Sequence, residues 1–263
     1  MDLRLRGRTA LVGGASAGLG RATAERLAQE GCKLALWSRG GERLERAAEE
    51  LRKLYSVVVV TVAGDAADPA TGAKVAWQAE RSLGPIDIAV LNAGGPIASE
   101  ATKTDPTEWR RSFQLLTLTP IEIATALLPG MRKRGWGRIV SIMSSGIRQP
   151  IPDLVYSNAC RSALQAWLKT IAAEVIADGV TVNGIVPGRI DTERVATLDR
   201  TRALKAGTTP EEIRAEHERS IPAGRYGRPD ELAAYAAWLC SDLSCYQTGT
   251  FVPIDGGMLR SLP

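Results

Sequence analysis

Aromatic residues are scarce in this chain, and histidine is almost absent. Aromatic side chains make up 5% of the 263 residues, and His217 is the one histidine. The four cysteines form no Cys-x-x-Cys pair, the first residues lack a signal-peptide pattern, and no uninterrupted apolar run approaches the about 20 residues that span a membrane. We therefore expect a soluble protein in the reducing cytoplasm, with no membrane partner and no bound metal.

An excess of charge of one sign is also lacking. The formal net charge is +4, and the basic residues alternate with acidic ones, as in the stretch from Arg43 to Arg52. Such alternation is typical of a solvated helix face. The sequence therefore predicts no nucleic-acid partner.

What the chain does contain is a regular alternation of strand-like and helix-like segments. Strands are predicted at residues 9–12, 33–38, 57–63, 86–92, 138–143 and 180–186, and helices from residue 18 and at 42–53, 73–83, 109–131 and 157–176. Repeated strand–helix–strand units indicate a parallel sheet that is covered on both faces. We expect one α/β domain over residues 1–263.

A glycine-rich stretch lies between the first strand and the first helix. In the run GGASAGLG at 13–20, Gly14, Gly18 and Gly20 allow a sharp turn, close approach to a pyrophosphate and tight packing of the helix on the sheet. The same spacing also occurs in turns that bind nothing, so the stretch alone leaves both interpretations open.

The segment 191–222 is charged and contains no strand pattern. A helix is predicted to begin near Thr209 and Pro210, which stand in the favoured capping and first-turn positions. We expect either a substrate lid over the carboxyl edge of the sheet or a plain surface hairpin. His217, in this segment, is interpreted as an exposed polar residue rather than a general base.

Taken together, the motifs resemble the short-chain dehydrogenase/reductase family along nearly the whole chain. Beside the glycine stretch, the matching pieces are Gly64–Asp68, Asn92-Ala93-Gly94, Ser144, Val186-Pro187-Gly188, Arg225–Glu231 and Asp255-Gly256-Gly257. The resemblance implies a Rossmann-type doubly wound sheet of about seven parallel strands, a nicotinamide cofactor and a homotetramer or homodimer.

The end of the second strand bears on the identity of the cofactor. The sequence there reads Trp37-Ser38-Arg39 without the acid that binds the ribose of NAD, and Arg39, Ser38 and Ser16 suit a 2′-phosphate. We expect NADP(H) rather than NAD(H), although Arg39 could simply be a solvated residue. The expected cofactor-binding residues are Gly14, Ser16, Gly18, Leu19, Gly20, Ser38, Arg39, Asp65, Ala66, Asn92, Ala93, Gly94, Arg161, Pro187, Gly188, Ile190 and Thr192.

The catalytic positions depart from the family pattern. The family uses Ser-x12-Tyr-x3-Lys with an Asn from the long helix, and here Ser144 keeps its place while Ser157, Arg161 and Leu116 occupy the Tyr, Lys and Asn positions. Tyr156 stands one residue before the expected place. It either enters the site as proton donor, with Arg161 supplying positive charge, or packs elsewhere. The candidate catalytic residues are therefore Ser144, Tyr156, Ser157 and Arg161.

We interpret the chain as an NADP(H)-dependent oxidoreductase that acts on a small-molecule carbonyl or alcohol. Reduction is the favoured direction, and a 3-oxoacyl thioester is one candidate substrate. Because three of the four polar groups of the family's site are replaced, two alternatives stay open. One is a dinucleotide-binding sensor or assembly protein with little activity, and the other is a non-redox enzyme on the same scaffold.

Overall fold

A computed structural model describes residues 1–260 of the chain. Its seven strands form one parallel sheet in the order β3-β2-β1-β4-β5-β6-β7. They span β1 Thr9–Gly13, β2 Lys33–Ser38, β3 Val59–Ala63, β4 Ile88–Leu91, β5 Gly137–Ile142, β6 Val180–Pro187 and β7 Phe251–Ile254. The expected doubly wound Rossmann-type sheet is confirmed.

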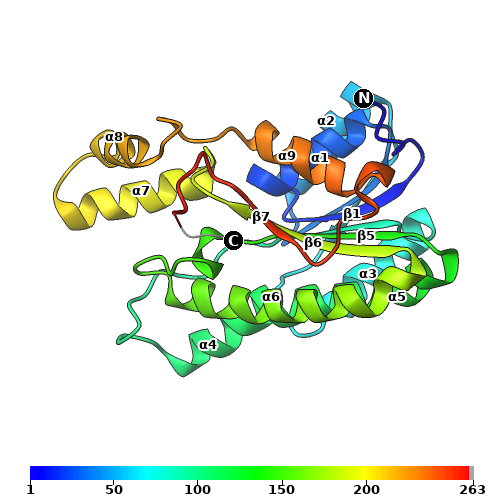
Figure 1. Cartoon of the computed structure of the whole chain (residues 1–263), viewed down its shortest axis with the longest axis horizontal. Helices are drawn as coiled ribbons and strands as arrows, with labels where there is room; N and C mark the ends of the chain where they lie inside the picture. The colour runs from blue at the N-terminus through cyan, green and yellow to red at the C-terminus, as the bar shows by residue number, and fades with distance from the viewer. Residues whose placement is uncertain (261–263) are drawn as a thin grey trace.

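Helices cover both faces of this sheet (Figure 1). One face carries α1 Gly18–Gln29, α2 Glu42–Tyr55 and α9 Pro229–Leu239, and the other carries α3 Thr71–Leu83, α4 Pro106–Phe113, α5 Thr119–Arg134 and α6 Val155–Val175. Two further helices, α7 Glu193–Ala206 and α8 Pro210–Ser220, lie beyond the carboxyl ends of the strands.

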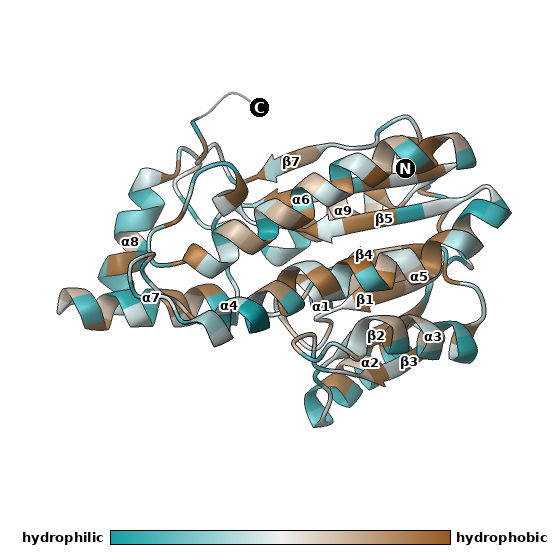
Figure 2. Cartoon of the chain, turned by 90° about the horizontal axis from the view of Figure 1, so that it is seen from below, coloured by the Kyte–Doolittle hydropathy of each residue, from teal (hydrophilic) through white to brown (hydrophobic). Residues whose placement is uncertain are grey.

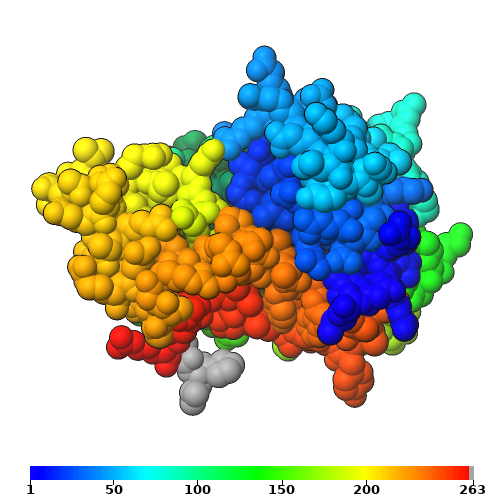
Figure 3. All heavy atoms as spheres, turned by 90° about the horizontal axis from the view of Figure 1, so that it is seen from above, coloured from blue at the N-terminus to red at the C-terminus, as the bar shows by residue number. Residues whose placement is uncertain are grey.

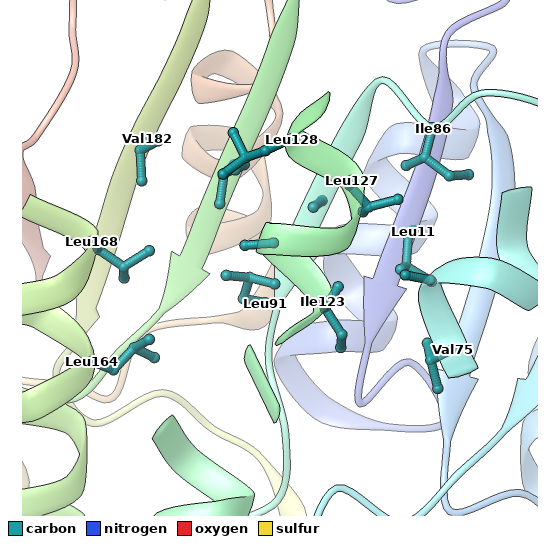
Figure 4. Close-up of a cluster of buried hydrophobic side chains, with 14 of the residues drawn as sticks. Leu11, Val75, Ile86, Leu91, Ile123, Leu127, Leu128, Leu164, Leu168 and Val182 are labelled. Carbon is teal, nitrogen blue, oxygen red and sulfur yellow. The ribbon is translucent and has the colours of Figure 1, made fainter. Parts of the chain in front are cut away.

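Strand side chains alternate between two separate hydrophobic cores. In β1, Leu11 faces the core under α3, α5 and α6, whereas its neighbours Ala10 and Val12 face the core under α1, α2 and α9. This is the period of two that a strand imposes, and burial on both faces explains why the strands are apolar throughout. Figure 4 shows the first core, in which Leu91, Ile123 and Leu164 meet between sheet and helices.

The long helical stretch expected at 109–131 is interrupted. It begins at Pro106, where the Asp105 carboxylate accepts a hydrogen bond from the Glu108 amide, and it passes through a π-helical turn at Gln114–Leu118 before α5. π-Turns insert a residue into a helix and are frequent at functional sites. The sequence periodicity did not reveal this turn.

By length and composition, the continuous stretch Pro106–Arg134 could cross a membrane, contrary to the expectation that no segment does. The expectation counted uninterrupted apolar runs, whereas this stretch reaches a mean hydropathy of 1.2 over an 18-residue window that includes polar residues. More than half of that window is buried in the fold, and Ile123, Leu127 and Met131 pack in the core. Its hydrophobicity is that of a core helix.

The segment after β6 forms two helices. The helix start predicted at Thr209 is confirmed, since the Thr209 hydroxyl accepts from the Glu212 amide and the Glu212 carboxylate accepts from the Thr209 amide. The helix α7 before it was not predicted. Figure 2 shows that the strands are largely hydrophobic, whereas α7 and α8 are largely hydrophilic, and in the space-filling view of Figure 3 these two helices form a lobe that projects beyond the body of the molecule.

Candidate active site

A cleft of about 1350 Å³ opens at the carboxyl ends of the strands, and α7 and α8 form part of its wall. The strand order reverses between β1 and β4, which is where open α/β sheets bind their ligands. Most of the residues expected at the site line this cleft: Gly14, Ser16, Gly18, Leu19, Ser38, Arg39, Asp65, Ala66, Asn92, Ala93, Gly94, Ser144, Ser157, Arg161, Pro187, Gly188, Ile190 and Thr192.

The glycine-rich turn has a backbone that other residues rarely adopt. Gly14 and Gly18 have φ angles of +60° and +55°, in the left-handed region. Gly20 does not line the cleft. A Cβ at Gly20 would collide with the carbonyl oxygens of Gly13 and Gly14, so this glycine permits α1 to pack closely on β1. No side chain caps the first amides of α1, and Gly18 and Leu19 line the cleft, which leaves these amides available to an anion.

The end of β2 carries a free positive charge. Arg39 is exposed at the cleft and forms no ion pair within residues 1–260. Ser38 lies beside it, and its hydroxyl accepts a hydrogen bond from the Gly40 amide. The nearby Asp65 carboxylate accepts from the Ala67 amide, which stabilises the loop after β3. The arrangement leaves the Arg39 guanidinium available to an anion.

On the opposite wall, side chains shape the two loops that follow β4 and β6. The Asn92 side-chain amide donates to the Gly13 carbonyl at 3.1 Å, which joins the ends of β1 and β4. Thr192 caps α7, and its methyl group is 3.7 Å from where a Cβ of Gly18 would lie. The loop after β6 therefore approaches the glycine turn directly across the cleft.

Three polar groups meet near the end of β5. The Ser144 hydroxyl accepts from the Gly146 amide at 3.1 Å, so its own proton remains available to a ligand. Ser157 lines the cleft from the first turn of α6, is 8% exposed, and its hydroxyl makes no hydrogen bond within the described chain. Arg161, one turn on, donates to the Ile142 carbonyl at 2.9 Å.

Arg161 is held as an unpaired cation. No carboxylate lies within 4.0 Å of its guanidinium among the described residues. Burial, and secondarily the charge of Arg194, lowers the pKa of Arg161 to about 10, so it stays protonated at neutral pH. A half-buried cation that lines the same cleft as two hydroxyls is suited to stabilise negative charge that develops on a substrate oxygen.

Tyr156 does not reach the cleft, which corrects the hypothesis that it donates the proton there. Its ring is 1% exposed and packs edge-on against Trp109, with ring centroids 4.8 Å apart. Its hydroxyl accepts from the Asp105 amide at 2.7 Å, at the start of α4. Because successive helical residues point about 100° apart, Ser157 faces the cleft while Tyr156 faces α4.

Leu116, at the position of the family's Asn, is 2% exposed and packs in the core, whereas its neighbour Leu115 lines the cleft. Both belong to the π-turn. In the next position, the Thr117 hydroxyl donates to the Cys160 carbonyl at 2.8 Å and links this turn to α6. The π-turn thus places the apolar side chain of Leu115, and no polar group from Leu116, at the cleft.

A buried network around His217 was missed by the sequence analysis, which placed this residue in solvent. His217 lines the cleft with 17% of its side chain exposed. Its Nε2 lies 2.8 Å from Arg189 and 2.9 Å from Arg202, and because guanidinium groups only donate, Nε2 is the acceptor. Nδ1 then donates to the Tyr226 hydroxyl, which donates to Asp199.

Burial, together with the charges of Arg189 and Arg202, lowers the pKa of His217 to about 4. The ring is therefore neutral at pH 7 and is a structural acceptor. Asp199 also pairs with Arg189 at 3.1 Å, so the network ties α7 and α8 to the loop after β6. The positions of His217 and its partners along the chain do not predict this contact.

The four cysteines differ in their exposure. All four are free, and Cys32, Cys160 and Cys240 are buried, but Cys245 is exposed. Burial raises the pKa of Cys160 to about 11, and this residue does not line the cleft. Its thiol is therefore unsuited to act in the site.

Comparison with known proteins defines the class of protein. The family described as enoyl-(acyl carrier protein) reductase matches residues 14–259. The 3-oxoacyl-(acyl-carrier-protein) reductase of Aquifex aeolicus is 31% identical over 98% of this chain and 100% of its own length. The chain belongs to the short-chain dehydrogenase/reductase family of oxidoreductases.

Particular relatives extend the similarity to the whole structure. The L-sorbose reductase of Gluconobacter frateurii, solved with NADPH and L-sorbose, is 33% identical with a TM-score of 0.94, and each chain covers 100% of the other. The NADPH-dependent reductase BacG of Bacillus subtilis is 28% identical over 97% of this chain and 99% of its own.

The position of Tyr156 predicts the effect of removing its hydroxyl. Tyr156→Phe removes the hydroxyl that accepts from the partly buried Asp105 amide, so we expect a loss of about 0.5–1.5 kcal/mol in the free energy of unfolding. Turnover with NADPH should stay within about threefold of the parent, since no proton passes through this group. Urea unfolding and steady-state kinetics measure the two effects. A fall in kcat of about a hundredfold at unchanged stability would restore Tyr156 to the proton path.

The His217 network predicts a pH-dependent stability. The pKa of His217 is about 4 in the folded chain and about 6.5 when unfolded, so the unfolded state binds more protons and stability is lost as pH falls from 6.5 towards 4. Between pH 7.5 and pH 5, the parent should lose about 2 kcal/mol more than His217→Gln, which does not titrate. Urea unfolding at both pH values tests this. Equal losses in the two proteins would contradict it.

Proposed function

We propose that this chain is an NADP(H)-dependent reductase that converts a carbonyl compound to an alcohol. The observation that carries the proposal is the free Arg39 guanidinium, with Ser38 beside it, at the end of a β2 strand that bears no acid. The 2′-phosphate of NADP carries a negative charge that can pair with this guanidinium, and NAD has no such phosphate. Two related reductases, from Gluconobacter frateurii and Bacillus subtilis, use NADPH, which supports the same choice.

The residues of the cleft fit such a dinucleotide along its length. Arg39, Ser38 and Ser16 suit the 2′-phosphate, and the amides of the Gly14–Gly18 turn suit the diphosphate. The residues that would hold the adenosine portion are Asp65, Ala66, Asn92, Ala93 and Gly94. Arg161, Pro187, Gly188, Ile190 and Thr192 suit the nicotinamide end. When bound, the cofactor supplies a hydride to the substrate carbon.

In the proposed reaction, the residues that act at the substrate oxygen are Ser144, Ser157 and Arg161. The two hydroxyls donate hydrogen bonds to the carbonyl oxygen, and the Arg161 charge stabilises the alkoxide that forms. Ser157 passes its proton to that oxygen and regains one from solvent water, since its hydroxyl is otherwise free. Arg161 keeps its own proton throughout.

A dinucleotide-binding protein with little activity is the second candidate. One observation favours it: within residues 1–260 the cleft is lined by no tyrosine, so the family's phenol has no direct replacement. The substrates to examine for the reductase are 3-oxoacyl thioesters, which the Aquifex aeolicus relative's name indicates for that protein, and smaller ketones.

The remaining parts of the proposal concern organisation. We include residues 1–263 in one domain, with 191–222 as a substrate lid, because α7 and α8 border the cleft. We also include a homotetramer or homodimer, supported by Phe113 and Leu118, which leave 40% and 38% of their surface exposed on the long helices. Four free cysteines are consistent with the cytoplasm.

Cofactor preference is predicted to depend on Arg39. Arg39→Ala should raise the Kd for NADPH roughly tenfold or more and leave the Kd for NADH nearly unchanged, because one charge-assisted phosphate contact is removed. The matched control is Arg46→Ala, an exposed arginine on α2 that does not line the cleft. Fluorescence titration measures both constants. Tighter binding of NADH than NADPH by the parent would contradict NADP(H) dependence.

Turnover tests the reaction itself. The parent should oxidise NADPH with at least one member of a panel of ketones and acetoacetyl thioesters, and Ser157→Ala should lower kcat by about a hundredfold. Ser162→Ala is the control, since Ser162 is exposed on the same helix and does not line this cleft. Tight NADPH binding without turnover on any compound would favour the binding protein.

A further inference from the structure

One face of α7 presents two arginines to the cleft. Arg194, Leu198 and Arg202 are spaced four residues apart, which places them along one side of the helix, and all three line the cleft. Arg194 donates to the Pro96 carbonyl at 2.9 Å, and Arg202 donates to His217 Nε2 at 2.9 Å. Each contact uses only part of a guanidinium that has five N–H donors.

Neither arginine has an acidic partner. No carboxylate lies within 4.0 Å of either guanidinium in residues 1–260. Of the acids lining this end of the cleft, Asp153 is paired with Lys205 and Glu193 with Arg43. Glu216 is exposed and lies beyond 4.0 Å from both.

Positive charge is therefore concentrated at the substrate end. Arg161 and Arg194 are close enough for their charges to interact, as are Arg189 and Arg202. The Asp199 carboxylate pairs with Arg189. The Asp153 carboxylate is close enough to interact with the Arg202 charge, but its ion pair is with Lys205. Clefts lined by charge of one sign focus the field and attract ligands of the opposite sign. This end of the cleft is therefore suited to a ligand that carries an anionic group.

The cofactor's phosphates do not account for Arg202. Thr192, at the start of α7, faces Gly18 of the glycine turn, and a helix rises 1.5 Å per residue. Arg202 thus lies about 15 Å along α7 from the diphosphate site, beside His217 of α8. Arg39 lies at the other end of the cleft, at the edge of β2.

From these observations, and resting on the reductase function proposed above, we infer that the carbonyl substrate carries an anionic group, a carboxylate or a phosphate, that Arg202 binds. Arg194 adds positive charge along the same helix face. His217 orients Arg202, because its Nε2 accepts one N–H of the guanidinium and leaves the other N–H donors free. The substrate class is therefore an oxo acid or a phosphorylated ketone rather than a neutral ketone.

Matched pairs of substrates test the inference. NADPH oxidation is measured with acetoacetate and its methyl ester, 4-oxopentanoate and its methyl ester, and dihydroxyacetone phosphate and dihydroxyacetone. In at least one pair, we expect kcat/KM of the parent to be roughly tenfold higher for the anion, mainly through KM, because a charge-assisted contact is gained. Which anion is preferred distinguishes carboxylate from phosphate.

Variants connect this preference to Arg202. Arg202→Ala should reduce the anion-to-neutral ratio of kcat/KM to near one, and Arg202→Lys should keep part of it. Arg200→Ala should keep the full ratio, since Arg200 is exposed on α7 and does not line the cleft. A general structural defect lowers both members of a pair and leaves the ratio intact. Equal rates for anion and neutral partner in the parent, or a ratio that survives Arg202→Ala, would overturn the inference.

A separate binding measurement tests the anion site if the reductase function itself fails. If the parent oxidises NADPH with none of the six compounds, calorimetric titration of the NADPH-loaded chain with 4-oxopentanoate and dihydroxyacetone phosphate, each beside its neutral partner, tests the anion site alone. Binding of an anion but not its neutral partner, lost in Arg202→Ala, supports the site. Equal binding, or no binding, refutes it.

Discussion

The reversal of strand order between β1 and β4 is the constraint on which the rest of this structure depends. Strands added to one side of β1 and then to the other leave a gap at their carboxyl ends, because the connecting helices cross on opposite faces. The close approach of α1 to β1 at Gly20 keeps the glycine turn beside that gap. Most residues of the candidate site reach the cleft from loops or helix starts that follow these strands.

The same scaffold carries an altered set of polar groups. At the start of α6, the phenol of Tyr156 is committed to a backbone amide of α4, and the neighbouring Ser157 takes the place on the cleft. A serine hydroxyl is a weaker acid than a phenol, so in the proposed reaction the unpaired charge of Arg161 is the main electrostatic contribution at the substrate oxygen.

Around α7 and α8, the positively charged side chains are held in place by hydrogen bonds. Asp199 and neutral His217 hold Arg189 and orient Arg202, so the cations of this region are fixed by hydrogen bonds before any ligand arrives. Preorganised donors lose little conformational entropy on binding. This differs from a loosely attached surface hairpin, because buried polar contacts connect α7 and α8 to the loop after β6.

The sequence predicted the parallel sheet, the positions of six of its seven strands to within about two residues, and a glycine turn and Arg39 at strand ends that face one cleft. These follow from local periodicity and from the order of strands and turns. The positions of Ser144, Ser157 and Arg161 in the same cleft were expected from the resemblance to the family, and β7 was not placed. The three-dimensional structure was needed to show where Tyr156 points, that the long helix contains a π-turn at Gln114–Leu118, and that a half-buried His217 lies between two arginines. Each of these depends on which distant side chain occupies the facing surface, and local sequence carries no record of that.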